Sequence, residues 1–247
     1  MDAAVPQPPV SVSLTVLPDV PCPYLPGRIE TLRAVMASSI DGDTYRAFMD
    51  AGFRRSGRMI YQPVCRECRE CVPIRVPVHF FVPSKSQRRA WNRNQDLLVT
   101  IAAPQQTPEK FDLYARYVRD WHQRGEEADP DSLEQFLYDS PTDTLEFEYR
   151  THDRRLIGVG ICDVSGTSLS SVYFYFDPAE SKRNLGTFSA VYEIEWARER
   201  GLNHYYLGYW IKDCAAMAYK ASFRPNERLN ERGQWTALST DDGDTQP

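Results

Sequence analysis

Residues 171–187 read SVYFYFDPAESKRNLGT, and this stretch indicates the fold more clearly than any other. The alternation of Tyr173 and Tyr175 predicts a strand with one half-buried face. Asp177-Pro178 ends that strand, and Gly186 precedes a helix expected over 187–200. This order of strand, glycine-containing loop and helix predicts an anion-binding site, because the first N–H groups of the helix point at the ligand.

Further strands are predicted on both sides of this stretch. Those at 144–151, 155–163 and 168–177 follow one another through short turns and predict antiparallel neighbours. A strand at 204–211 follows the helix, so the expected class is α+β with a mixed, largely antiparallel sheet. The strand–loop–helix order resembles N-acetyltransferase-like folds, which hold a pyrophosphate at this place. We expect a C-terminal domain over 108–238.

The N-terminal half predicts a smaller, separate block. We expect a flexible or extended arm at 1–20, a cysteine-containing domain at 21–103 and a linker at 103–108. The acidic tail at 239–247 is expected to be disordered.

Composition describes an ordinary globular chain of 247 residues with a net charge of −5. No apolar run approaches the roughly 18 residues that span a bilayer, and the first residues do not form a secretory signal. We therefore expect a cytoplasmic protein. Charge is unevenly distributed: residues 54–93 carry ten Lys and Arg against two acids, which can attract a polyanion despite the acidic average.

The cysteines at Cys65, Cys68 and Cys71 are each separated by two residues, and Cys22 lies near the N-terminus. This spacing lets thiolates point at one ion, and four soft ligands suit zinc or an iron–sulfur cluster. The alternative is a run of reduced thiols packed in a turn, without metal.

A basic helix is predicted after Ser84, where Ser84 and Gln87 fit a capping box. The helix carries four cations and no acid, with Trp91 among them. Arginine binds carboxylate and phosphate, and tryptophan stacks on bases. The alternative is a solvated basic surface with Trp91 in the core. The four cations are Lys85, Arg88, Arg89 and Arg93.

Lys220 lies in a predicted helix at 213–222, beside aromatic residues. A lysine next to an apolar wall can shift its pKa or bind a substrate anion. We interpret His122 and His152 as structural or surface residues.

At these positions the sequence resembles the bacterial aspartate/glutamate leucyltransferases, relatives of the eukaryotic arginyl-tRNA–protein transferases. The resemblance runs from about residue 15 to about 236. It implies a small N-terminal domain and a C-terminal acetyltransferase-like (GNAT-like) domain over 108–238. The matching stretches are CPYL (22–25), GFRRSG (52–57), YQPVCRECRECVPIRV (61–76), SKSQRR (84–89), VYFYFDP (172–178), LGT (185–187) and LGYWIKDCAAMAYKASFRP (207–225).

The resemblance implies transfer of leucine from leucyl-tRNA to proteins that begin with Asp or Glu, which marks them for N-degron proteolysis. The reaction is aminolysis of an ester, and it requires no cofactor beyond the charged tRNA. We expect Asp177 to position or deprotonate the amine and Lys220 to stabilise the developing oxyanion. The expected substrate-binding residues are Lys85, Arg88 and Arg89 for the acidic side chain, Arg183 and Gly186 for the acceptor-end phosphates, and Tyr173 and Tyr175; Trp91 and Arg93 are expected to bind tRNA.

Three alternatives remain open at this point. The donor could be arginyl-tRNA, since the residues do not by themselves distinguish the two amino acids. The chain could also be a non-catalytic, metal-stabilised RNA-binding module, or an enzyme that acetylates from acetyl-CoA.

Overall fold

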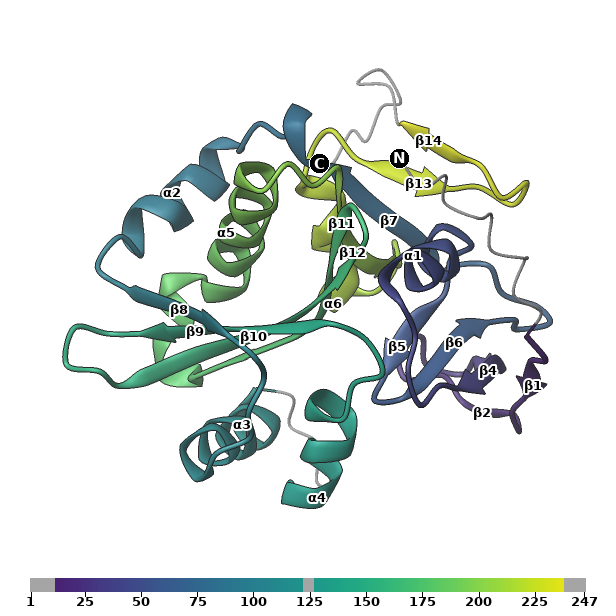
Figure 1. Ribbon diagram of the computed structural model, residues 1–247, viewed down its shortest axis with the longest axis horizontal. Helices are drawn as coiled ribbons and strands as arrows, with labels where there is room; N and C mark the ends of the chain where they lie inside the picture. The colour runs from purple at the N-terminus through teal and green to yellow at the C-terminus, as the bar shows by residue number, and fades with distance from the viewer. Residues whose placement is uncertain (1–11, 122–126, 238–247) are drawn as a thin grey trace, which may run out of the picture.

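The computed structural model describes residues 12–121 and 127–237. Within them, a large sheet of eight strands dominates the molecule (Figure 1). The strands, in spatial order, are β14 (Trp235–Ala237), β13 (Glu227–Leu229), β7 (Val72–Pro77), β12 (His204–Trp210), β11 (Ser168–Phe176), β10 (Leu156–Ser165), β9 (Thr144–Arg150) and β8 (Leu98–Ala102). The α+β class and the mixed, largely antiparallel sheet are thereby confirmed.

One pairing in this sheet is parallel, that of β11 with β12, and it is short. Its register joins Ser168–Ser170 to His204–Tyr206, although β11 continues to Phe176 and β12 to Trp210. The opposite edge of β12 pairs with β7 and shifts register between Tyr206 and Gly208. Because β11 and β12 stop pairing halfway, backbone and side chains from other elements meet between their C-terminal ends.

Helices cover both faces of the large sheet (Figure 1). On one face, α5 (Leu185–Glu199) packs against β11 and β12, and α2 (Lys85–Arg93) packs against α5. On the other face, α3 (Pro108–Asp120) packs against β10 and β11. The remaining helices and turns are α1 (Gly42–Asp50), α4 (Pro130–Leu133), α6 (Ala215–Ala218), η1 (Val78–Phe80), η2 (Glu134–Tyr138), η3 (Pro178–Arg183) and η4 (Tyr219–Ser222).

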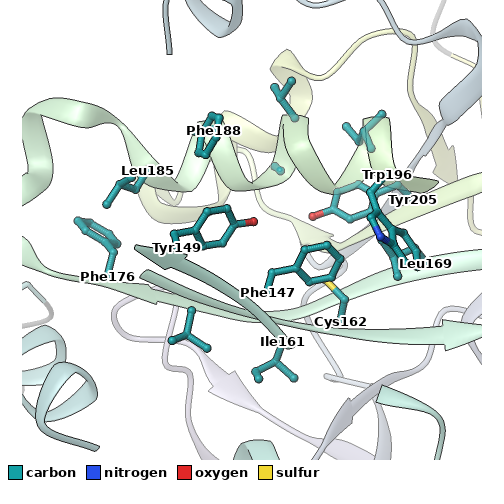
Figure 2. Close-up of a cluster of buried hydrophobic side chains, with 14 of the residues drawn as sticks. Phe147, Tyr149, Ile161, Cys162, Leu169, Phe176, Leu185, Phe188, Trp196 and Tyr205 are labelled. Atoms are coloured by element: carbon teal, nitrogen blue, oxygen red, sulfur yellow. The ribbon is translucent and has the colours of Figure 1, made fainter. Parts of the chain in front are cut away.

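The core lies between α5 and the sheet, where large aromatic side chains interlock (Figure 2). The ring of Phe147 meets that of Trp196 at 5.6 Å between centroids, and Tyr149 meets Phe188 at 5.8 Å. Edge-to-face pairs of this kind stabilise a core beyond the area that they bury. The side chains of α5 are therefore fixed against β9, on the same face as the start of the predicted anion cradle.

A small four-stranded sheet forms the second unit, and it does not contain all of the predicted N-terminal domain. Its strands, in spatial order, are β1 (Thr15–Val16), β4 (Leu32–Met36), β6 (Met59–Pro63) and β5 (Arg54–Ser56), and β2 (Val20–Pro21) pairs separately with β3 (Ile29–Glu30). Strands β7 and β8 and helix α2, which we expected within 21–103, join the large sheet and its helical layer. Of the predicted arm, the described part contributes β1. The tail at 239–247 and His122 lie outside the described residues, and His152 is exposed.

Of the helices in the described residues, none combines the length and the apolar character that crossing a bilayer requires.

Candidate active site

Lys220 is buried between the diverging ends of the central strands. It lies in η4, where its side chain turns inward and donates a hydrogen bond from Nζ to the carbonyl oxygen of Tyr209 at 2.9 Å. Only 8% of the residue is exposed. Burial, and then the positive charge of Arg54, lower the pKa of Lys220 to about 7. The sequence prediction of a lysine with a shifted pKa beside aromatic residues is consistent with this environment.

Arg54 shares this position with Lys220. The sequence placed it in the basic stretch and in the matching stretch GFRRSG (52–57), but gave it no role of its own. It comes from β5 of the small sheet, is 7% exposed, and donates from Nη1 to Ser170 Oγ at 2.9 Å and from Nη2 to the carbonyl oxygen of Ser171. These acceptors lie where β11 stops pairing with β12. A single sequence gave no signal that two consecutive arginines would both be buried.

Gly208 shows how close the two cations are. A Cβ atom placed on it would lie 3.5 Å from Arg54 Nε and 3.5 Å from Lys220 Nζ. Its φ of +86° is a conformation that residues with a side chain rarely adopt. The glycine therefore leaves a methyl-sized space that touches both cations.

Helix α2 places its predicted cations on the outside of the molecule. The capping box of Ser84 and Gln87 is present, so the predicted helix start is confirmed. Lys85, Arg88 and Arg89 are exposed. Gln87 is buried and donates from Nε2 to the carbonyl oxygen of Ser222 at 3.3 Å, which attaches the start of the helix to the segment that carries Lys220.

The C-terminal end of α2 is attached to η3. Arg93 donates to the carbonyl oxygen of Lys182, and Asn94 Nδ2 donates to that of Arg183 at 2.9 Å. The guanidinium of Arg183 pairs with Asp96 through two hydrogen bonds, of 2.9 and 3.0 Å, and with Glu180. Arg93 and Arg183 therefore anchor the 178–183 segment, and their predicted contacts with nucleic acid would have to compete with these bonds.

Trp91 takes part in the packing of α2 on α5. Its ring lies 5.7 Å from that of Phe188 and 6.1 Å from that of Tyr192, between centroids. Trp91 therefore packs against the hydrophobic core, as in the alternative interpretation of the basic helix, and does not form an open surface for stacking on a base.

Asp177 has several partners at the end of β11. Its Oδ1 accepts from the backbone N–H of Ala179 at 3.0 Å, and its Oδ2 lies 3.2 Å from Arg155 and 3.6 Å from Arg116. Both carboxylate oxygens therefore already have partners, and an incoming amine would have to compete with them. A role for Asp177 toward the amine stays a prediction.

Tyr173 and Tyr175 face α3 and η2, on the sheet face opposite α5. The Tyr173 ring lies 5.1 Å from that of Phe136, and the Tyr175 hydroxyl lies 2.8 Å from that of Tyr138. Gly186 lies in the first turn of α5, where an added Cβ would come no closer than 3.9 Å to Phe174. The start of α5 therefore has room for an approaching anion, while the two tyrosines pack as one face of the sheet.

The four predicted metal ligands are partly or fully buried and free of disulfides. Burial, with added effects from Cys65, Cys22 and Cys68, raises the pKa of the Cys71 thiol to about 12. Among residues 12–121 and 127–237, however, no three His, Cys, Asp or Glu side chains are arranged to hold a metal ion. A zinc ion or iron–sulfur cluster stays a prediction.

A surface hollow of about 450 Å³ lies beside this cysteine segment. It includes Cys68, but Lys220, Arg54 and the α2 cations do not line it. The hollow therefore does not contain the residues predicted for catalysis and substrate binding.

Comparisons with known proteins agree with the motifs. Residues 20–89 match the family described as arginine-tRNA-protein transferase, N terminus, and residues 109–230 match the corresponding C terminus. The aspartate/glutamate leucyltransferase of Saccharophagus degradans is 40% identical, over 87% of this chain and 92% of that protein. The enzyme of the same name from Hahella chejuensis is 38% identical, over 90% and 95%.

Solved structures resemble the chain more distantly. The structure of L-PGS from Bacillus licheniformis has a TM-score of 0.46 and 13% identity, covering 70% of this chain and 52% of that one. FemX also has a TM-score of 0.46, with 9% identity, covering 73% and 64%. Sequence identity near 40% over almost the whole length, with both halves matched in order, is far more specific, and the chain belongs to the aspartate/glutamate leucyltransferase family.

Proposed function

We propose that this protein transfers leucine from leucyl-tRNA to the α-amino group of proteins that begin with Asp or Glu. The relatives of this name support the assignment of donor and acceptor. The observation in the structure that supports it best is the buried pair of Arg54 and Lys220 beside Gly208, because two neighbouring buried cations favour a negatively charged ligand.

The reaction forms an amide bond while the ester bond to the ribose breaks. The α-amino nitrogen attacks the leucyl carbonyl carbon, the amine gives up a proton, and the ribose oxygen leaves and takes one up. An α-amino group has an unperturbed pKa of about 7.7–8.0, so part of it is neutral at cellular pH. The protein therefore contributes mainly proximity and charge placement.

Lys220 is the residue best placed to stabilise the oxyanion that develops on the leucyl carbonyl. An ammonium group carries three donors, and one of them already binds the carbonyl oxygen of Tyr209. This bond fixes Nζ between β11 and β12, so the remaining donors need little reorganisation during the reaction.

The exposed cations of α2 fit the tRNA better than the acidic side chain of the acceptor. Lys85, Arg88 and Arg89 lie in solvent on a helix attached to the Lys220 segment through Gln87. Contacts of exposed cations with phosphates supply affinity without depending on sequence. We assign these three residues to the backbone of the charged tRNA.

The test is a transfer assay with defined substrates. Purified protein, leucyl-tRNA carrying labelled leucine and peptides beginning with Asp or Glu should yield labelled peptide, and a peptide with an acetylated N-terminus should not. Arginyl-tRNA in parallel tests the alternative donor. Labelling from arginyl-tRNA alone would overturn the leucyl assignment, and tRNA binding without any product would favour a non-catalytic RNA-binding module.

A further inference from the structure

Arg54 and Lys220 are buried cations whose partners are all uncharged among the described residues. Arg54 donates to the hydroxyl of Ser170 and the carbonyl oxygen of Ser171, and Lys220 donates to the carbonyl oxygen of Tyr209. In the part of the chain that the structure describes, no carboxylate forms an ion pair with either residue. Other buried cations differ: Arg55 pairs with Asp163, and Lys110 pairs with Glu146.

A buried charge without a partner is costly, and two that repel each other are more so. The effect is visible at Lys220, where burial and Arg54 both disfavour the charged form. An anion bound between the two side chains would relieve this cost. The arrangement is therefore incomplete without a negatively charged ligand.

We propose that Arg54, with Lys220 beside it, is the subsite that receives the side-chain carboxylate of the acceptor's N-terminal Asp or Glu. This inference rests on the proposed leucyl transfer and names the residues that select its substrate. A carboxylate between the two cations would leave the α-amino group of the same residue three bonds from the carboxylate carbon in Asp and four in Glu, near the donors of Lys220.

The burial of the two cations favours a carboxylate over a phosphate of the tRNA. A Cβ atom placed on Gly208 would contact Arg54 Nε and Lys220 Nζ at 3.5 Å each, so the glycine keeps a side chain away from both cations. A phosphodiester is larger and continues into the RNA chain on both sides, so it suits the exposed cations of α2. The planar fork of an arginine also matches a carboxylate with two parallel hydrogen bonds.

Burial is also what strong selectivity requires. Exposed ion pairs are screened by water and salt, so they contribute too little to distinguish Asp from Asn sharply. A buried site built to bind a polar group rejects an analogue without it by about 10⁴–10⁵, because the site is then left unpaired. Arg54 fulfils this condition, and Lys85, Arg88 and Arg89 do not.

The experiment compares kcat/KM for two peptides that differ only in an N-terminal Asp or Asn, at saturating leucyl-tRNA. In Arg54→Gln, the Asp-over-Asn ratio should fall by about 10- to 100-fold, which corresponds to the loss of a hydrogen bond to a charged group. Arg54→Lys should recover part of the ratio, since it restores the charge without the fork. Arg119→Gln removes an equal charge from an exposed position on α3 and should keep the wild-type ratio.

A purely structural role of Arg54 would lower transfer to both peptides alike and leave the ratio unchanged, which would overturn the inference. If Arg54→Gln does not fold, as judged by circular dichroism, Lys220→Met provides the test through binding, measured as the ratio of the Kd values of the two peptides, because the second cation should also favour Asp over Asn. An unchanged ratio in Lys220→Met would then refute the subsite. Absence of leucyl transfer by the wild-type protein would instead refute the proposed function, so the two failures are distinguishable.

Discussion

Arg55 and Asp163 form an ion pair that is completely buried, with Arg55 Nε 2.8 Å from Oδ2 and Nη2 2.8 Å from Oδ1. Arg55 lies in β5 of the small sheet and Asp163 in β10 of the large one. Tyr45 and Thr144 donate to the same carboxylate. Asp163 of β10 is paired directly with Ser170 of β11, so the pair that fixes Arg55 also holds Arg54 beside its acceptor Ser170.

Replacing Asp163 with Asn should strongly destabilise the protein. The substitution leaves the buried charge of Arg55 without a counterion, and breaking a buried pair in this way costs about 3–5 kcal/mol. The free energy of unfolding in urea, followed by circular dichroism, measures this effect. Because Arg54 lies in the same strand, leucyl transfer should decrease at temperatures where the variant is still folded.

The matched control is Asp139→Asn, which removes an acid that pairs with Arg58 at the surface. Exposed pairs contribute about 0–1 kcal/mol, so this variant should unfold close to the wild-type midpoint. If both variants were destabilised equally, the Arg55–Asp163 pair would not be the connection between the sheets that we describe.

Local patterns predicted most elements of this fold. The helix expected after Ser84 is α2, the one expected at 187–200 is α5, and the strand expected at 168–177 is β11. Each has a signal within a few residues, such as a capping side chain or alternating aromatics. The helix expected at 213–222 is instead a short α6 followed by a 3₁₀ turn, and the turn directs Lys220 inward.

What local patterns could not predict are pairings between distant segments. Strand β7 joins the large sheet beside β12, which lies more than a hundred residues away in sequence. The cysteine segment before β7 therefore could not predict which sheet this strand belongs to. The same holds for Arg54, whose acceptors lie in β11. Lys220 was found because an isolated lysine among aromatic residues is itself a local signal, whereas Arg54 lay within a run of cations.

The buried carboxyl of Glu193 should make stability depend on pH. Burial raises its pKa, although Ser189 donates to it at 2.5 Å and Tyr205 also donates. The folded state then keeps a proton that the unfolded state has released, so stability falls as pH rises above the unfolded value of about 4.3 and levels off above the folded pKa.

In Glu193→Gln this part of the pH dependence should disappear. Melting temperatures measured from pH 4 to pH 8 should decline less steeply than those of the wild type. Glu199→Gln, on the exposed side of the same helix, serves as the control and should retain the wild-type slope. A Glu193→Gln profile parallel to the wild type would show that the carboxyl does not hold its proton in the folded state.

Neutralising the outer face of α2 should weaken binding of tRNA and leave the choice of acceptor unchanged. In the triple variant Lys85→Gln, Arg88→Gln and Arg89→Gln, the KM for leucyl-tRNA should rise. The slope of log K against log salt should decrease by about one for each phosphate that the variant no longer binds. The Asp-over-Asn ratio should stay at its wild-type value, because Arg54 and Lys220 are untouched. If the triple variant had no preference for Asp but bound tRNA normally, the cations of α2 would be the residues that bind the acidic side chain of the acceptor.

Gly208→Ala should abolish most transfer by filling the space between the two cations. The added methyl would lie 3.5 Å from Arg54 and from Lys220, where the proposed carboxylate has to enter. The φ of +86° at Gly208 also adds strain of about 1–3 kcal/mol in the alanine variant, which by itself lowers stability.

Gly201→Ala separates these two effects, because Gly201 has a φ of +69° but nothing within 4 Å of the added atom. Both variants should melt at lower temperatures than the wild type, and only Gly208→Ala should show a large decrease in kcat/KM for the Asp peptide at about 20 °C, well below either melting transition. Equal activities in the two variants would mean that the space beside Gly208 is not where the acceptor binds.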